Sequence, residues 1–125
     1  MEWSKLLSTK RLSGKEATHR NEFDDDYKRI VTSPSFRRLQ DKTVFPLERL
    51  DFIHTRLTHS LEVAIVARSL AKEIVILLQE EVEKKPDSSK EEMIARQEDV
   101  LKIVECASLV HDLGNPPYGH FGEDI

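Results

Sequence analysis

The fold is decided by residues 55–84, which read TRLTHSLEVAIVARSLAKEIVILLQEEVEK. Apolar side chains recur through this stretch at near-helical spacing, at Leu57, Leu61, Ala64, Ile65, Leu70, Ile74 and Leu77 or Leu78. The pattern predicts the longest helix of the chain, beginning at Phe52 or Thr55 and ending near Lys84. We expect the apolar face of this helix to be buried.

Residues 88–113 carry a second helical pattern. Ser88 or Ser89 is expected to begin this helix, because two glutamates at residues 91 and 92 then lie near the positive end of the helix dipole. The pattern continues without a predicted break to Leu113, where Gly114 is expected to end it.

Shorter elements are predicted before the long helix. Residues 23–31 favour a short helix, and Ser33 followed by Pro34 is typical of the N-cap and first position of another, which reaches Lys42. Pro46 prevents continuation, so residues 44–51 are expected to form a loop. Residues 1–20 lack clear periodicity and are expected to form a poorly ordered arm before a helical core at residues 21–125.

Length and composition favour one helical domain. The chain has 125 residues, 34% of them charged and 6% aromatic, with four glycines, which predicts an all-α fold. It contains no uncharged apolar run of about 18 residues and no signal-peptide core, so we expect a cytoplasmic protein without membrane contact. Cys106 is the only cysteine, which excludes an internal disulfide and suits a small buried hydrophobic residue without a catalytic role.

Charge is distributed unevenly along the chain. The net charge of −4 argues against a surface that binds nucleic acid everywhere. Between residues 28 and 56, however, seven basic residues stand against three acidic ones, which suits a polyanionic ligand. Between residues 80 and 105, nine acidic residues stand against five basic ones, which is typical of solvated surface.

A candidate metal site lies at the end of the second helical pattern. His111 follows Ala107 by four residues, which places it on the inward side of that helix, and Asp112 comes next. A buried imidazole and carboxylate need partners, and His59 near the start of the long helix joins them if the two helices pack together. The alternative is a core histidine bonded to a carbonyl, with Asp112 as a helix-end residue and His59 in a polar patch.

A second pair of titratable residues follows Gly114. His120 and Glu123 are three residues apart on an expected helical turn, where a carboxylate can orient an imidazole for proton transfer. The alternative is a glycine-rich turn with an ordinary exposed histidine and glutamate.

Five motifs in order resemble the bacterial deoxyguanosinetriphosphate triphosphohydrolases of the HD-domain superfamily. The resemblance covers nearly the whole chain. The motifs are WSKLL at residues 3–7, FRRLQDKT at 36–43, VFPL at 44–47, RLTHSLEV at 56–63 and HDLGNPPYGHFGE at 111–123.

This resemblance implies an incomplete HD-domain helical bundle, the N-terminal part of a phosphohydrolase domain spanning residues 1–125. It implies that His59, His111 and Asp112 bind a divalent metal ion, Mg²⁺ or Mn²⁺. In the family, a further aspartate lies on a helix well downstream of the last motif, so we expect this chain to be an N-terminal fragment with weak or no activity. Relatives of full length are expected to form homo-oligomers.

The same resemblance assigns roles around the metal. His120 matches the catalytic histidine, Glu123 its supporting carboxylate, and Arg56 an arginine that contacts substrate phosphate. The family's glutamine before the Val-Phe-Pro motif is absent from this chain, which leaves sugar recognition open and gives Gln40 a candidate substrate-binding role. The expected reaction is hydrolysis of a deoxynucleoside triphosphate to the deoxynucleoside and inorganic triphosphate, and Asn115 favours dGTP.

Two alternatives remain open from the sequence. One is another HD-superfamily phosphohydrolase that acts on a phosphomonoester or on a cyclic or alarmone nucleotide. The other is a non-catalytic piece that binds single-stranded nucleic acid through basic residues such as Arg37, Arg38 and Lys42. Low aromatic content provides few stacking surfaces for the second alternative.

Overall fold

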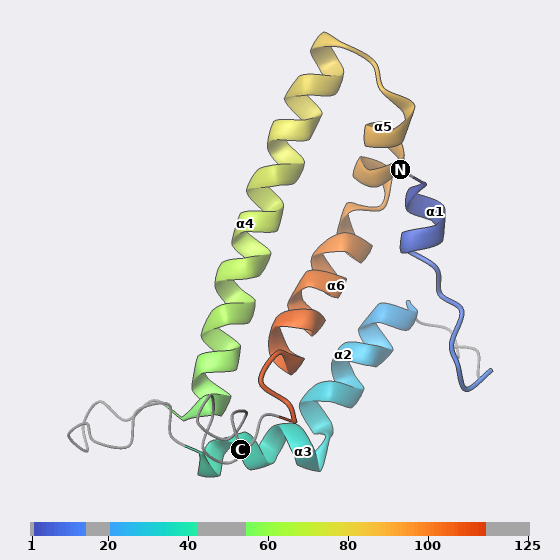
Figure 1. Cartoon of the computed structure of the whole chain (residues 1–125). Helices are drawn as coiled ribbons and strands as arrows, with labels where there is room; N and C mark the ends of the chain where they lie inside the picture. Colours follow the sequence, from blue (N-terminus) through green and yellow to red (C-terminus); the bar gives the residue numbers. More distant parts are fainter. Residues whose placement is uncertain (1, 15–20, 43–54, 115–125) are drawn as a thin grey trace, which may run out of the picture.

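A computed structural model of the chain describes residues 2–14, 21–42 and 55–114, and these residues contain helices and no strand (Figure 1). The all-α fold class predicted from the sequence is confirmed. In chain order the elements are α1 (Trp3–Leu6), α2 (Glu22–Thr32), α3 (Pro34–Arg37), the 3₁₀ helix η1 (Arg38–Asp41), α4 (Arg56–Lys84), α5 (Ser88–Ala95) and α6 (Gln97–Val110). None of the described helices is long and apolar enough to cross a membrane.

Helix α4 begins and ends close to the predicted bounds. The Thr55 side chain caps it by accepting a hydrogen bond from the backbone N–H of Thr58 at 3.3 Å. The chain leaves the helix at Lys85, and Pro86 follows. The Asp87 side chain then caps α5, so the N-cap lies just before the predicted Ser88 or Ser89.

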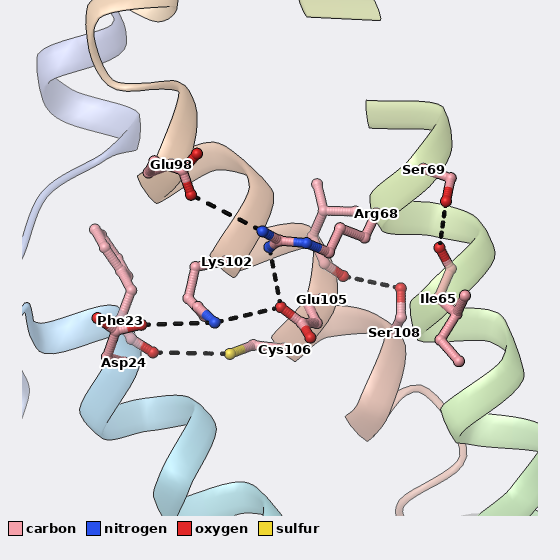
Figure 2. A network of polar contacts seen from close by, with 11 residues as sticks. Phe23, Asp24, Ile65, Arg68, Ser69, Glu98, Lys102, Glu105, Cys106 and Ser108 are labelled. Atoms are coloured by element: carbon pink, nitrogen blue, oxygen red, sulfur yellow. Dashed lines mark hydrogen bonds and ion pairs between the residues drawn. The ribbon is translucent and has the colours of Figure 1, made fainter. Parts of the chain in front are cut away.

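Helices α4 and α6 run side by side in opposite directions, and α2 lies along the other side of α6 (Figure 1). Ion pairs join the three helices, as Figure 2 shows. Arg68 of α4 bonds Glu105 of α6 at 3.2 Å, and Lys102 of α6 lies 3.6 Å from Asp24 of α2. Such partly exposed pairs contribute about 1 kcal/mol or less each, so they align the helices more than they stabilise them.

The predicted single helix over residues 88–113 is wrong, because the structure breaks it at Arg96. Arg96 has φ −109° and ψ 26°, outside the helical region, and separates α5 from α6. Its guanidinium donates to the carbonyl of Leu7 at 2.8 Å and to the Asp99 carboxylate at 2.9 Å. The break therefore turns Arg96 toward the N-terminal segment.

The expectation of a poorly ordered N-terminal arm is wrong for residues 2–14, because contacts such as this one hold them against the helices. Leu7 is buried at the end of α1, and its carbonyl is held by Arg96. Arg11 bonds Asp26 of α2 at 2.6 Å. Residues 2–14 are thus attached to α2 and to the α5–α6 junction, while residues 15–20 lie outside the described part.

The core gathers where α4 begins and α6 ends. Phe36, Leu39, Ala64 and Leu109 form a buried cluster, and Leu113 packs against it. Ser33 caps α3 and Pro34 occupies its first turn, as predicted. The short helices that follow place Phe36 and Leu39 in the cluster with residues of α4 and α6. The predicted loop at residues 44–51 lies outside the described residues.

The predicted buried face of α4 is largely wrong. The buried residues of this helix are Ser60, Ala64 and Val75. Five residues of the predicted face are exposed, because α6 covers one side of α4 and the apolar positions extend further round the helix than one neighbour reaches. They are Leu61, Ile65, Leu70, Ile74 and Leu77.

Candidate metal centre

His59 lies in the first turn of α4 and is half-buried. Its backbone N–H donates to the carbonyl of the N-cap residue Thr55 at 3.0 Å. The capped helix start therefore fixes the backbone from which this imidazole projects toward the end of α6.

His111 follows Val110, the last residue of α6. Its Nδ1 lies 2.6 Å from the carbonyl oxygen of Ser108. A carbonyl only accepts hydrogen bonds, so Nδ1 carries the hydrogen and Nε2 of the neutral ring presents its lone pair. This arrangement resembles that of metal-binding histidines, in which the nitrogen away from the metal donates to a fixed oxygen.

Asp112 completes a group of three potential ligands. Its Oδ2 lies 3.6 Å from Nε2 of His111, and the rings of His59 and His111 meet edge to face with centroids 5.4 Å apart. One ligand atom from each of the three residues lies within 4.8 Å of the other two. Ligands about 2.1 Å from a shared ion stand roughly 3 Å apart when adjacent and about 4 Å when opposite, so small side-chain adjustments bring the three atoms to that spacing.

The chemistry of these donors suits a divalent cation. Two neutral imidazole nitrogens and one carboxylate are ligands that first-row divalent metals accept, and carboxylate oxygen also suits Mg²⁺. The predicted convergence of His59 with His111 and Asp112 is present in the structure. Their role as metal ligands remains a prediction.

The predicted inward position of His111 is wrong. Its side chain is 37% exposed, whereas Leu109, two residues earlier, is only 1% exposed. Leu109 fills the inward position of the last turn, which leaves His111 at the rim of the core facing His59. The carbonyl bond of the alternative interpretation is present, but it uses only Nδ1 of the ring.

Arg56 begins α4, one turn before His59. Its backbone N–H donates to the carbonyl of Lys42 at 2.8 Å, which joins the end of η1 to the start of α4. Its Nη1 is buried and has no hydrogen-bond partner among the described residues. A buried guanidinium nitrogen without an acceptor is costly, so this position favours a bound anion.

The other predicted residues are less well placed. Gln40 is exposed on η1, two residues before Lys42. His120, Glu123 and Asn115 lie outside the described residues, so their roles stay predictions.

Two features of the site were missed from the sequence. A carbonyl partner for His111 was part of the alternative interpretation, but the sequence did not identify that partner as Ser108, three residues earlier on the helix. Ser60, next to His59, is completely buried, and its hydroxyl has no hydrogen-bond partner among the described residues. A polar residue on the buried side of α4 was not predicted.

A family model and individual relatives both match this chain. The model of the HD domain family matches residues 56–125, which contain all three candidate ligands. A deoxyguanosinetriphosphate triphosphohydrolase-like protein of Listeria monocytogenes is 47% identical over 131 residues, covering 99% of this chain and 27% of the relative. A protein of the same description from Pseudomonas aeruginosa is 45% identical over 129 residues, covering 99% of this chain and 27% of the relative.

A deoxyguanosinetriphosphate triphosphohydrolase of Klebsiella pneumoniae is 53% identical over 102 residues, which cover 81% of this chain and 19% of the relative. The chain thus spans about a quarter of the length of the curated relatives it matches. Because the family model matches more than half of the chain and includes the His59, His111 and Asp112 cluster, the chain belongs to the HD domain family.

Proposed function

We propose that the protein, at the full length of its relatives, hydrolyses a deoxynucleoside triphosphate, preferably dGTP, to the deoxynucleoside and inorganic triphosphate. The observation that carries the proposal is the convergence of His59, His111 and Asp112, with a buried Nη1 of Arg56, one turn before His59, that has no hydrogen-bond partner among the described residues. The relatives named deoxyguanosinetriphosphate triphosphohydrolase support this substrate class.

His59, His111 and Asp112 are the residues that would hold Mg²⁺ or Mn²⁺. When bound, such an ion lowers the pKa of a coordinated water and offsets negative charge on phosphate oxygens. The hydrogen bond between His111 Nδ1 and the Ser108 carbonyl keeps the ring oriented before any ligand arrives.

The reaction forms a bond between a water oxygen and the α-phosphorus. In one mode of attack, the bond that breaks joins this phosphorus to the oxygen that bridges it to the β-phosphorus. In the other mode, the bond that breaks joins it to the 5′ oxygen of the sugar. Release of the intact triphosphate requires the second mode, in which the 5′ oxygen departs. The departing 5′ oxygen requires a proton, and the attacking water loses one. We assign proton transfer to His120, with Glu123 orienting its ring, on the motif resemblance alone.

Arg56 is the phosphate-binding residue in this proposal. Its planar guanidinium offers paired N–H donors, and charge-assisted bonds of this kind are about twice as strong as neutral ones. Because Nη1 is buried and lies on the residue one turn before His59, a triphosphate oxygen would supply the acceptor that the described residues do not provide.

The substrate test uses the protein at the full length of its relatives, incubated with each deoxynucleoside triphosphate and Mn²⁺. We expect inorganic triphosphate as the phosphate product, with dGTP consumed fastest, when products are separated by ion-exchange chromatography. Pyrophosphate or orthophosphate as the first product would exclude the proposed bond cleavage and favour another HD-type phosphohydrolase reaction.

The metal test uses His111→Ala, with His19→Ala as a matched histidine variant outside the proposed ligand set. We expect His111→Ala to lose bound Mn²⁺, measured by elemental analysis after dialysis, because Nε2 is the preoriented donor. His19→Ala should keep the metal content of the unmodified protein. Equal metal content in both variants would remove His111 from the ligand set.

A further inference from the structure

Helix α4 carries an apolar surface that no described element covers. Val66, Leu70, Ile74 and Leu77 are between 53% and 60% exposed. At 3.6 residues per turn, their spacings of four, four and three place them within roughly 80° of arc on one side of the helix. We call these four residues the outer stripe.

The outer stripe faces a different direction from the buried side of α4. Ala64 and Val75 mark the side that α6 covers, and helical geometry places that side about a third of a turn away from the stripe. In Figure 1, the described helices lie together on one side of α4, and its outer side is open along most of its length.

A continuous row of large aliphatic side chains is different from scattered surface leucines. Single exposed apolar residues are ordinary on a protein surface, whereas a helix that is apolar on more than one side is typically covered on each of them. The outer stripe has the spacing that a second helix fills by packing its side chains between successive turns. We therefore expect a helical occupant.

The charged residues beside the outer stripe indicate what kind of helix would pack there. Glu62, Glu73 and Glu80 follow one edge of the outer stripe, at helical angles within roughly 20° of one another. On a second copy of this chain packed antiparallel across the stripe, Glu62 would face Glu80 of the other copy, and such like-charge pairs are destabilising. An edge of this kind favours a helix bordered by lysine or arginine.

Arg68 of α4 is turned away from this edge. Arg68 points to α6, where it bonds Glu105 at 3.2 Å and lies 3.9 Å from Glu98 (Figure 2). Its guanidinium is therefore engaged on the covered side of the helix.

The relatives indicate where such a helix comes from. Those from Listeria monocytogenes and Pseudomonas aeruginosa have nearly three-quarters of their length outside the match, which provides ample sequence for a covering helix in the same polypeptide. From the exposed stripe, its acidic edge and this length, we propose that the outer stripe docks an amphipathic helix with a basic edge, supplied by the same polypeptide at the full length of its relatives. This inference is independent of the proposed substrate.

Cysteine labelling tests the proposal in a Cys106→Ser background. Leu70→Cys places a thiol in the outer stripe, and Lys72→Cys places a control thiol on an exposed position of α4 away from the stripe. We expect a maleimide to label Leu70→Cys at least tenfold more slowly in the protein at the full length of its relatives than in the 125-residue chain. Lys72→Cys should be labelled at similar rates in both.

Three outcomes would overturn the proposal. Equal labelling rates for Leu70→Cys in the two proteins would show that no helix covers the stripe. Protection that appears only as protein concentration rises would assign the stripe to a second copy. Protection unaffected by an added Glu73→Lys change would exclude a basic edge on the docked helix, because charge reversal should restore labelling severalfold.

Discussion

Replacing Leu109 by alanine should weaken the fold and the candidate metal centre together. Leu109 is 1% exposed and belongs to the buried cluster that includes Ala64. The change removes three buried carbons, worth about 0.8 kcal/mol each, and leaves a cavity, so the free energy of unfolding should fall by about 3 kcal/mol. A chain of this size has a total stability of roughly 6–19 kcal/mol, so the loss is a substantial part of it.

Urea unfolding of the 125-residue chain, followed by far-ultraviolet circular dichroism, measures this loss. Leu70→Ala is the matched control, because it makes the same chemical change at a side chain that is 60% exposed and should cost about 1 kcal/mol or less. Leu109 lies two residues before His111, so Mn²⁺ affinity measured by titration calorimetry should also fall in Leu109→Ala and stay unchanged in the control. If the two variants lost equal stability, the buried cluster would not be what stabilises the packing of α4 against α6.

Three further predictions concern the contacts that shape the helices. Arg96→Ala removes the bond to the Leu7 carbonyl and should cost about 2 kcal/mol in urea unfolding. It should also make residues 2–14 more susceptible to limited proteolysis, and unchanged proteolysis would contradict that anchoring role. Asp87→Ala removes the cap of α5 and should cost about 1 kcal/mol, whereas Asp87→Asn, which retains a capping oxygen, should cost clearly less in the same assay. The fold raises the pKa of the Cys106 thiol from its ordinary value of 9.0, chiefly because burial disfavours the thiolate. Stability contributed by the neutral thiol is therefore complete below pH 9.0 and is lost as pH rises through the folded-state pKa; Cys106→Ala should reduce this alkaline loss in unfolding curves measured between about pH 8 and about pH 11.

Features encoded by neighbouring residues were predictable from the sequence. The start of α4 depends on the Thr55 cap, and the start of α3 depends on Ser33 and Pro34, so local patterns placed both starts correctly. The predicted helix to Lys42 instead ends as α3 at Arg37 and continues as the 3₁₀ helix η1. The break at Arg96 was not predictable in this way, because its partner Leu7 lies 89 residues away in the chain. A long-range bond to a backbone carbonyl leaves no periodic signal.

The candidate site shows the same division. Convergence of His59 with His111 and Asp112 follows from packing the start of one helix against the end of another, which the patterns anticipated. The exposure of His111 did not follow, because it depends on Leu109 filling the inward position of the final turn. The exposed side of α4 was misjudged for a similar reason, since apolar spacing alone does not tell how many neighbours a helix has.

If His111 binds a cation as proposed, its bond to the Ser108 carbonyl would couple that binding to backbone dynamics. A cation at Nε2 withdraws electron density from the ring, which makes the Nδ1 hydrogen a better donor and draws the carbonyl more firmly toward it. The C-terminal turn of α6 should then fray less often, and its amide hydrogens should exchange with solvent more slowly. Loading of the centre would thus be measurable as hydrogen-exchange protection along this turn, without any substrate turnover.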